Sequence, residues 1–303
     1  MYIVLFFSVC NDSSHTAPNC GKSGQTAMAH TLRRSRPVLA LAAAAALALT
    51  GCGSGGPHDV ETPSGITVQL VDDDHLTTCT TLPYPPFEQE KGDKVVGFDF
   101  DIVDAVSKKL GIETEPVDIR FDSIKSGAAL SGGTCDVAAG GMTITDERKK
   151  NLDFSDPYFD EQLAFMTPKG TTVESIEDVT DQKLKLGVQI ATTSLDYATE
   201  HGLDPQQFDD AGKELQALRS GTVDVVLQDF PVVNDWLADD EIAADFELGG
   251  TFTTGNQYGF GFTKDGDPKL REVFNDVLAD MKSDGTYDEV YETWFHSKPP
   301  KSS

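Results

Sequence analysis

The stretch "CDVAAGGMTITDERKK", Cys135–Lys150, joins a predicted strand to a predicted helix start. Its apolar half ends in Gly140 and Gly141, and such a run is typical of a strand buried in a parallel sheet. Thr145 is placed to cap a helix whose first turn is acidic, which suits the positive end of a helix dipole. Arg148 follows at the third helical position, where a cation is unfavourable, so we expect it to serve a function.

Strand and helix patterns alternate on both sides of this stretch. Before it, "LTTCTT" and residues 117–121 are predicted strands, and residues 98–111 and 122–130 are predicted helices. After it, "KLKLGVQI" and "TVDVVLQD" are predicted strands around two short helices. The alternation indicates an α/β protein of two units with right-handed crossovers between parallel strands. A helix after Pro231, the strand "YGFGFTK" and two C-terminal helices follow, and chain order alone assigns them to neither unit.

The N-terminal segment has the pattern of a signal peptide. Arginines precede the apolar stretch Val38–Thr50, which is too short for a membrane-spanning helix of about 20 residues. The ending L-T-G-C resembles a lipobox, so we expect residues 1–51 to be removed and Cys52 to carry lipid; an ordinary secretory signal with a chance cysteine is the alternative. Met28 stands at the usual distance ahead of the arginines, so we expect residues 1–27 to be an upstream mis-start.

Composition limits the partners of the mature chain. Without the signal peptide it has 20 basic and 49 acidic residues, a net charge of −29, which argues against binding nucleic acid or adhering electrostatically to anionic lipid. Residues 52–66 are predicted to hold the lipidated cysteine and a flexible tether, and residues 298–303 a tail. Cys79 and Cys135 remain as a pair in an oxidising compartment, where a disulfide is favoured over two separate buried thiols.

The first unit offers an anion site. In open α/β sheets, ligands bind beyond the carboxyl ends of strands, at helix starts. Gly140 and Gly141 let a ligand approach the backbone, Met142 and Thr143 follow them, and Arg148 adds a planar set of donors suited to a carboxylate. The alternative is that Arg148 pairs with Glu147 or another surface acid.

The second unit offers the opposite charge. Asp229 ends an apolar strand, and a carboxylate there needs a partner, either a ligand ammonium or a structural Lys or Arg. Thr192 and Thr193 offer hydroxyls and amides at a strand end, although helix capping explains them equally well. A zwitterion would bridge the two units, with Tyr84 and Phe121 as flat walls around its side chain.

Catalytic and metal patterns are weak. The chain has no G-x-S-x-G, H-E-x-x-H or G-x-x-x-x-G-K-[ST] motif, and the acidic run "VDDDH" is interpreted as solvated surface. We therefore expect no metal and no cofactor. Phe87, beside the predicted wall residue Tyr84, is interpreted as a core residue.

Several long motifs, in order, resemble one family. "YPPFE", "GFDFDIVDAVSKKLG", "CDVAAGGMTITDERKKNLDFSDPYF" and "GTVDVVLQDFPVV" are similar to the extracytoplasmic solute-binding proteins of polar amino-acid ABC importers, known as bacterial family 3. The resemblance implies a type II periplasmic-binding-protein fold, in which two α/β lobes are joined by a two-crossover hinge with a cleft between them. It implies residues 67–168 plus 252–297 for lobe 1 and residues 169–251 for lobe 2.

The resemblance also implies roles for single residues. Tyr84 and Phe121 would enclose the ligand side chain. Asp229 would hold its ammonium group. The carboxylate would be held by Gly141, Thr143 and Arg148, helped by Thr193.

Departures from the family pattern bear on specificity. Ala191 stands where many relatives have glycine. Thr81 stands where cation-selective members often have an acid, and Gln189 and Gln228 could bond to an uncharged or acidic side chain. The sequence therefore favours a polar uncharged or acidic amino acid.

The family implies partners and a location as well. We expect a monomer, lipid-anchored to the outer face of the cell membrane, that delivers its ligand to ABC permease subunits. The rival hypothesis is an extracytoplasmic dehydratase-like enzyme on the same scaffold, for which Glu88 is the nearby candidate acid or base.

Overall fold

The computed structural model describes residues 56–300. The predicted signal peptide, the expected lipidation site Cys52 and the expected mis-start at residues 1–27 lie outside the described residues. Between residues 56 and 300, no helix combines the length and the apolar character that a bilayer span needs.

The first five-stranded sheet has the order β6-β3-β7-β14-β8. Strand β3 (His75–Thr80) is parallel to its neighbours β6 (Glu113–Asp118) and β7 (Val137–Ala138). Strand β14 (Gly261–Thr263) is antiparallel to both β7 and β8 (Leu152–Phe154), so a C-terminal strand completes a sheet begun near the N-terminus. We call the part around this sheet lobe 1.

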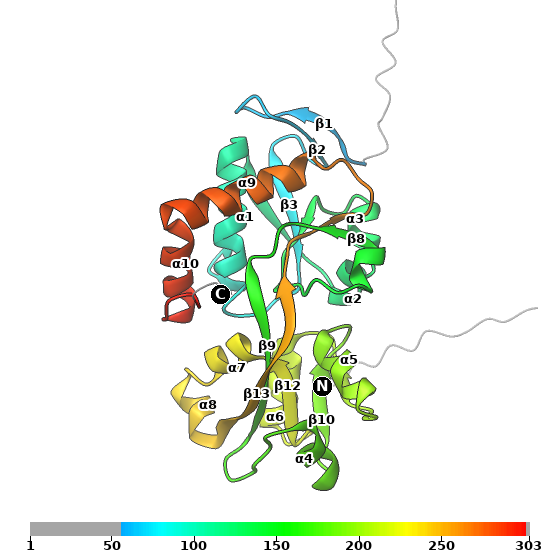
Figure 1. Ribbon diagram of the computed structural model, residues 1–303, viewed down its shortest axis with the longest axis vertical. Coiled ribbons are helices and arrows are strands. Elements are labelled where there is room, and N and C mark those ends of the chain that lie inside the picture. The colour runs from blue at the N-terminus through cyan, green and yellow to red at the C-terminus, as the bar shows by residue number, and fades with distance from the viewer. Residues whose placement is uncertain (1–55, 301–303) are drawn as a thin grey trace, which may run out of the picture. The chain divides into compact units, whose positions relative to one another are not determined.

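The second sheet, the centre of lobe 2, has the order β11-β10-β12-β9-β13. Parallel strands β10 (Leu186–Gln189), β11 (Gln206–Phe208) and β12 (Val225–Asp229) form one side. The long strands β9 (Phe159–Pro168) and β13 (Phe246–Tyr258) are antiparallel partners, and Figure 1 shows them running side by side from one sheet into the other. These strands are the two crossovers.

The predicted lobe boundaries, after residue 168 and after residue 251, fall at the end of β9 and inside β13. Residues 163–166 of β9 pair with β12, and β13 pairs with β9 from residue 246 onward, so both strands belong to the sheet of lobe 2. The far ends of the same two strands, at Phe159 and Tyr258, pack against Phe87 in the aromatic cluster of lobe 1, so each crossover strand spans both lobes. The apolar run "QLAFMTP" carries no mark of which sheet it joins, because a buried strand looks the same in either.

Helices of lobe 1 cover its sheet (Figure 1). Helix α1 (Phe98–Leu110) ends at Gly111 in the left-handed conformation, as predicted, and α9 (Lys269–Asp284) and α10 (Thr286–Phe295) pack against it. The predicted helix 122–130 is instead two, α2 (Phe121–Lys125) and α3 (Ala128–Ser131). The break is at Gly127, with φ of 75°, where a Cβ would lie 2.6 Å from the carbonyl oxygen of Asn151.

Lobe 2 carries five helices in the described part of the chain. The predicted helices are present as α5 (Thr193–Glu200), α6 (Ala211–Arg219) and α7 (Phe230–Trp236). The shorter α4 (Ile176–Asp181) and α8 (Asp240–Asp245) were not predicted.

Part of the predicted flexible tether is a strand. β1 (His58–Glu61) pairs antiparallel with β2 (Thr67–Leu70), and Val60 and Thr62 are buried. A second small hairpin joins β4 (Gln89–Lys91) and β5 (Lys94–Val96). Gly, Ser and Pro around residue 60 suggested a linker, but here they form the turns of a hairpin.

The predicted helix at Thr145 is only the 3₁₀ turn η1 (Arg148–Lys150). Glu147 is its N-cap residue, and Thr145 two residues earlier accepts a hydrogen bond of 3.1 Å at Oγ1 from the amide of Arg148. Three residues make no substantial dipole, so the expected conflict between Arg148 and a helix dipole does not arise.

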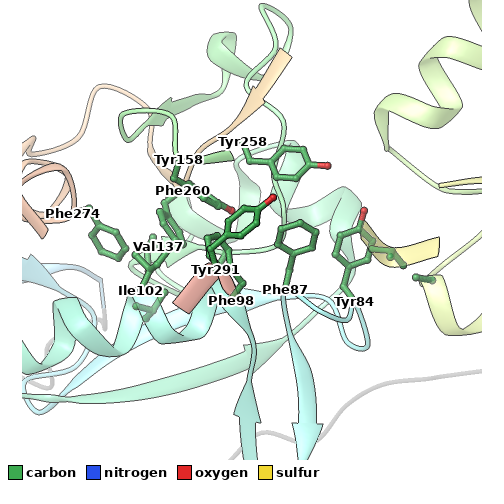
Figure 2. Close-up of a cluster of buried hydrophobic side chains, with 14 of the residues drawn as sticks. Tyr84, Phe87, Phe98, Ile102, Val137, Tyr158, Tyr258, Phe260, Phe274 and Tyr291 are labelled. Carbon is green, nitrogen blue, oxygen red and sulfur yellow. The ribbon is translucent and has the colours of Figure 1, made fainter. Parts of the chain in front are cut away.

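A buried aromatic cluster extends through lobe 1 towards the cleft side of the sheet. Phe87 is fully buried and lies 5.5 Å from Tyr258 between ring centroids, which agrees with its interpretation as core. Figure 2 shows Tyr84 at the margin of this cluster, where its ring stacks beside Phe87 at 5.9 Å. The core thus fixes the position of Tyr84.

Candidate functional site

A small cavity collects side chains from both lobes. Its volume is about 20 Å³, room for about one water molecule. Of the predicted site residues, Met142 and Gln228 do not line it: Met142 is buried in the core, and Gln228 is buried behind Tyr84. The lining residues are Thr81, Tyr84, Glu88, Phe121, Gly140, Gly141, Thr143, Arg148, Gln189, Thr192, Thr193 and Asp229.

Arg148 enters the cavity from lobe 1 with two donors already in use. Nη1 donates to the carbonyl of Thr143 at 2.9 Å and Nη2 to the carbonyl of Ala191, in lobe 2, at 3.2 Å, while Nε has no partner among residues 56–300. The guanidinium carbon lies 5.2 Å from the ring centroid of Phe121, a cation–π distance. Burial lowers the pKa of Arg148, and the nearby carboxylate of Glu161 opposes that shift.

The expected alternative for Arg148, a pair with Glu147, is wrong. Glu147 lies 3.4 Å from the ammonium of Lys125 instead. Ala191, at the position where we expected glycine in many relatives, has φ of 66°, a conformation that favours glycine. That conformation accompanies the carbonyl bond to Arg148 across the two lobes.

We expected a ligand to approach the backbone at Gly140 and Gly141. Their amides instead point to a buried acid. Both donate to Oδ2 of Asp99 at 3.0 Å, and the hydroxyl of Tyr158 donates to the same oxygen at 2.8 Å. Burial raises the pKa of Asp99 to about 6, and these donors limit the shift. Gly141 is needed for close packing, because a Cβ there would lie 3.2 Å from the ring of Tyr84.

Asp229 enters from lobe 2 at the end of β12. Its Oδ2 accepts a hydrogen bond from the hydroxyl of Tyr84, which also donates to Oε1 of Gln228 at 3.0 Å. Gln228 in turn donates from Nε2 to buried Glu214 at 2.8 Å, so its amide orientation is fixed. Burial raises the pKa of Asp229 to about 7, with the charge of Glu161 adding to the shift. Within residues 56–300, no Lys or Arg pairs with Asp229, so the structural-cation alternative has no support there.

Glu161, on crossover strand β9, was not predicted as a site residue. Its Oε1 accepts from the hydroxyls of Thr143 in lobe 1 (2.6 Å) and Thr193 in lobe 2 (2.8 Å). Its Oε2 accepts from Thr254 and from Asn256 at 3.1 Å, both on the other crossover. Each hydroxyl has one proton, so the two predicted clamp threonines direct theirs to Glu161 and not into the cavity. The sequence signal that could have identified Glu161 is its charge inside the strand-like run "FDEQLAFM".

The remaining predicted residues have local partners. Thr192 accepts from the amide of Leu195 at 3.3 Å, so it caps α5 as the alternative proposed. Thr81 donates its hydroxyl proton to the carbonyl of Ile119 at 2.7 Å. Gln189 keeps its Oε1 without a partner in the described range. These contacts leave Gln189 as the lining amide free to bond to a ligand.

Cys79 and Cys135 form a disulfide, with an S–S distance of 1.99 Å and 5.7 Å between Cα atoms. Both are buried in one cluster with Phe121 and Met142. The disulfide therefore stiffens the wall of lobe 1 directly behind the cavity.

Glu88 was considered only for the enzyme hypothesis, yet it lines the cavity with 1 % of its surface exposed. Burial and the neighbouring carboxyl of Asp99 raise the pKa of Glu88 well above its usual range. Little in the sequence indicated that Glu88 lines the cavity. It is the last residue of the turn "LPYPPFE", where a glutamate is not unusual.

Comparison with known proteins agrees with this architecture. Residues 76–297 match the family model of bacterial extracellular solute-binding proteins, family 3. The chain belongs to this family. A probable histidine-binding protein of Neisseria gonorrhoeae is 31% identical over 270 residues, which cover 85% of this chain and 94% of that one. The arginine-binding extracellular protein ArtP of Bacillus subtilis is 28% identical over 85% of this chain and 96% of its own.

Solved structures support the fold of this family 3 protein. An ancestral arginine-binding protein bound to glutamine is 38% identical, with a TM-score of 0.68 over 74% of this chain and 98% of that one. The ancestral amino acid-binding protein AncCDT-1, described as a precursor of cyclohexadienyl dehydratase, is 34% identical, with a TM-score of 0.66 over 73% and 95%. The two sheets with their crossovers form the type II periplasmic-binding-protein fold, as expected.

Proposed function

We propose that this family 3 protein binds a polar amino acid between its lobes and delivers it to an ABC permease. One observation carries the proposal. Arg148 from lobe 1 and Asp229 from lobe 2 are both buried, line the same cavity and are not paired with each other in a salt bridge. Two opposite charges held apart in this way complement the carboxylate and ammonium of a zwitterion.

The free atoms suit such a ligand. Arg148 has Nε unused, so it can donate to an incoming carboxylate without giving up its two carbonyl partners. Tyr84 occupies Oδ2 of Asp229, which leaves Oδ1 for a ligand ammonium. Because the threonine hydroxyls are committed to Glu161, the guanidinium is the principal carboxylate donor.

Capture requires the lobes to separate. Residues of both lobes line the cavity, so we infer that the ligand enters a more open form and closure follows. Closure is favoured only by contacts that the ligand makes to both lobes at once. The paired crossovers β9 and β13 are the hinge in this scheme.

Names of relatives support an amino acid as the ligand. They include a glutamine-binding and an arginine-binding protein of Bacillus subtilis. Calorimetry against the twenty amino acids tests the proposal, with Arg148→Ala and Asp229→Ala as variants. We expect each variant to lose about 3 kcal/mol, more than 100-fold in affinity, because a desolvated ligand charge is left unpaired. Near-normal affinity in both variants would contradict the assignment.

The enzyme hypothesis has less support, because the relatives named above are binding proteins. A turnover assay on ligand-saturated protein distinguishes the two, since a binding protein returns its ligand unchanged.

Anchoring is the remaining part of the proposal. We propose that Cys52 is diacylated and holds a monomer on the outer face of the cell membrane. A Cys52→Ser variant should then appear in the culture medium instead of the membrane fraction. Recovery of that variant in membranes would argue against the anchor.

A further inference from the structure

Helix α2 lies at the edge of lobe 1 that faces α5 of lobe 2 (Figure 1). Its first residue, Phe121, lines the cavity. A cation stands at each end of the helix, with Arg120 immediately before it and Lys125 as its last residue. The chain has 24 basic and 50 acidic residues, so two cations placed beside the cleft call for an explanation.

Arg120 binds one acid of each lobe. Its Nε and Nη2 donate to the two carboxylate oxygens of Asp122 in lobe 1, each at 3.1 Å, and its Nη1 donates to Oδ1 of Asp209 in lobe 2 at 2.6 Å. The two bonds to Asp122 already orient the guanidinium, so little further side-chain entropy is lost when Asp209 approaches. Asp209 is itself held by Lys213, at 3.3 Å.

Lys125 repeats this arrangement at the other end of α2. Its Nζ lies 3.4 Å from Oε1 of Glu147 in lobe 1 and 3.8 Å from Oδ2 of Asp196, on α5 of lobe 2. The side chain of Lys125 is 18 % exposed and that of Arg120 is 54 % exposed, so solvent screens the lysine contacts less. Both ends of α2 are thus joined to lobe 2 by a cation that an acid of lobe 1 positions.

We propose that the segment Arg120–Lys125 is an electrostatic clasp, which favours closure of the lobes and raises ligand affinity through residues that the ligand does not touch. The inference rests on the proposed function, because the lobes must open and close around a ligand. Closure brings Asp209 and Asp196 to these cations, so the contacts stabilise the closed state relative to the open one. Neither the two cations nor their partners in lobe 2 line the cavity.

The two cations also separate acids that belong to opposite lobes. Without Arg120, Asp122 of lobe 1 would face Asp209 of lobe 2, and without Lys125, Glu147 would face Asp196. Like charges brought together by closure oppose it. Loss of a cation should therefore weaken ligand binding more than loss of its partner acid in lobe 2, a difference that ion pairs without any effect on closure would not produce.

A double-mutant cycle measured by calorimetry tests the clasp, with L-glutamine and L-arginine as probes. We expect Arg120→Met to weaken binding about fivefold and Asp209→Asn about threefold, the range of an exposed ion pair. The double variant should bind about as well as Asp209→Asn alone, because the repulsion left by Arg120→Met is then removed. Lys264→Met is the matched control: its ion pair with Asp153, at 2.8 Å, lies wholly within lobe 1, so affinity should stay that of the wild type.

Small-angle X-ray scattering gives a readout that needs no ligand. The variant with both Arg120→Glu and Lys125→Glu should have a larger radius of gyration than the wild type, because like charges then hold the lobes apart. Additive losses in the cycle, or an equal loss of affinity in Lys264→Met, would overturn the clasp and leave the proposed function standing. If neither probe binds the wild type, the screen of all twenty amino acids decides on the proposed function and scattering decides on the clasp, which equal radii would overturn.

Discussion

Replacing Glu161 by Gln is the most direct test of how the two lobes are joined. The carboxylate accepts four hydrogen bonds, from Thr143 in lobe 1, Thr193 in lobe 2, and Thr254 and Asn256 on β13. A glutamine has one acceptor oxygen, so one pair of donors would face an NH₂ group and lose its acceptor. Hydrogen bonds to a charged group contribute about 1.5–3 kcal/mol each, and the two that remain would be neutral.

We therefore expect Glu161→Gln to lower the free energy of unfolding by about 3 kcal/mol, measured by urea denaturation monitored by tryptophan fluorescence. Asn256→Ala, which removes a single donor to the same carboxylate, should cost about half as much. Ligand affinity should fall as well, because the charged acceptor that Thr143 of lobe 1 and Thr193 of lobe 2 share is lost. A change in stability below about 0.5 kcal/mol, the level of an ordinary surface substitution, would refute the role assigned to Glu161.

Three further predictions follow from other contacts. Removing the disulfide with Cys79→Ser and Cys135→Ser should cost about 4 kcal/mol, from the chain-entropy relation and a sequence separation of 56; reduced and oxidised wild type compared in urea should show the same difference. Gly141→Ala should lower the melting temperature more than Gly255→Ala, because both have positive φ but only Gly141 would bring a Cβ against Tyr84; equal losses would contradict the contact. Burial raises the pKa of both Asp99 and Asp136 to about 6, above their unfolded values, so the folded state binds more protons at pH 4–6. The free energy of unfolding should therefore fall as pH rises from 5 to 7, and Asp136→Asn should flatten that profile.

Much of the fold could be predicted because its helices and strands have local sequence signals. The stripe of α9 and the glycine stop of α1 are readable without any tertiary information. The lobe limits could not be read, because β9 and β13 have the same buried pattern in whichever sheet they join. The hairpin at Val60 was not predicted. Its buried residues Val60 and Thr62 are outnumbered by the turn-forming residues around them.

The sequence predicted which residues line the site better than it predicted their hydrogen-bond partners. Arg148, Tyr84 and Asp229 line one cavity because strand ends converge there, which is a rule of the fold class. Partners far apart in sequence are not local, so the acceptor of the threonine hydroxyls, Glu161, and that of the glycine amides, Asp99, could not be found. The sequence indicates which side chains line the site. The acceptor to which each hydroxyl or amide donates depends on packing between residues that are far apart in the chain.

The place of β14 has a consequence for how the chain is made. This strand, Gly261–Thr263, fills the gap between β7 and β8, more than a hundred residues after both. The sheet of lobe 2 is one continuous segment and can form once β13 has emerged, whereas the sheet of lobe 1 stays open until β14 follows. During synthesis and export, the half that carries Arg148 and the disulfide is thus the last to become a folded surface.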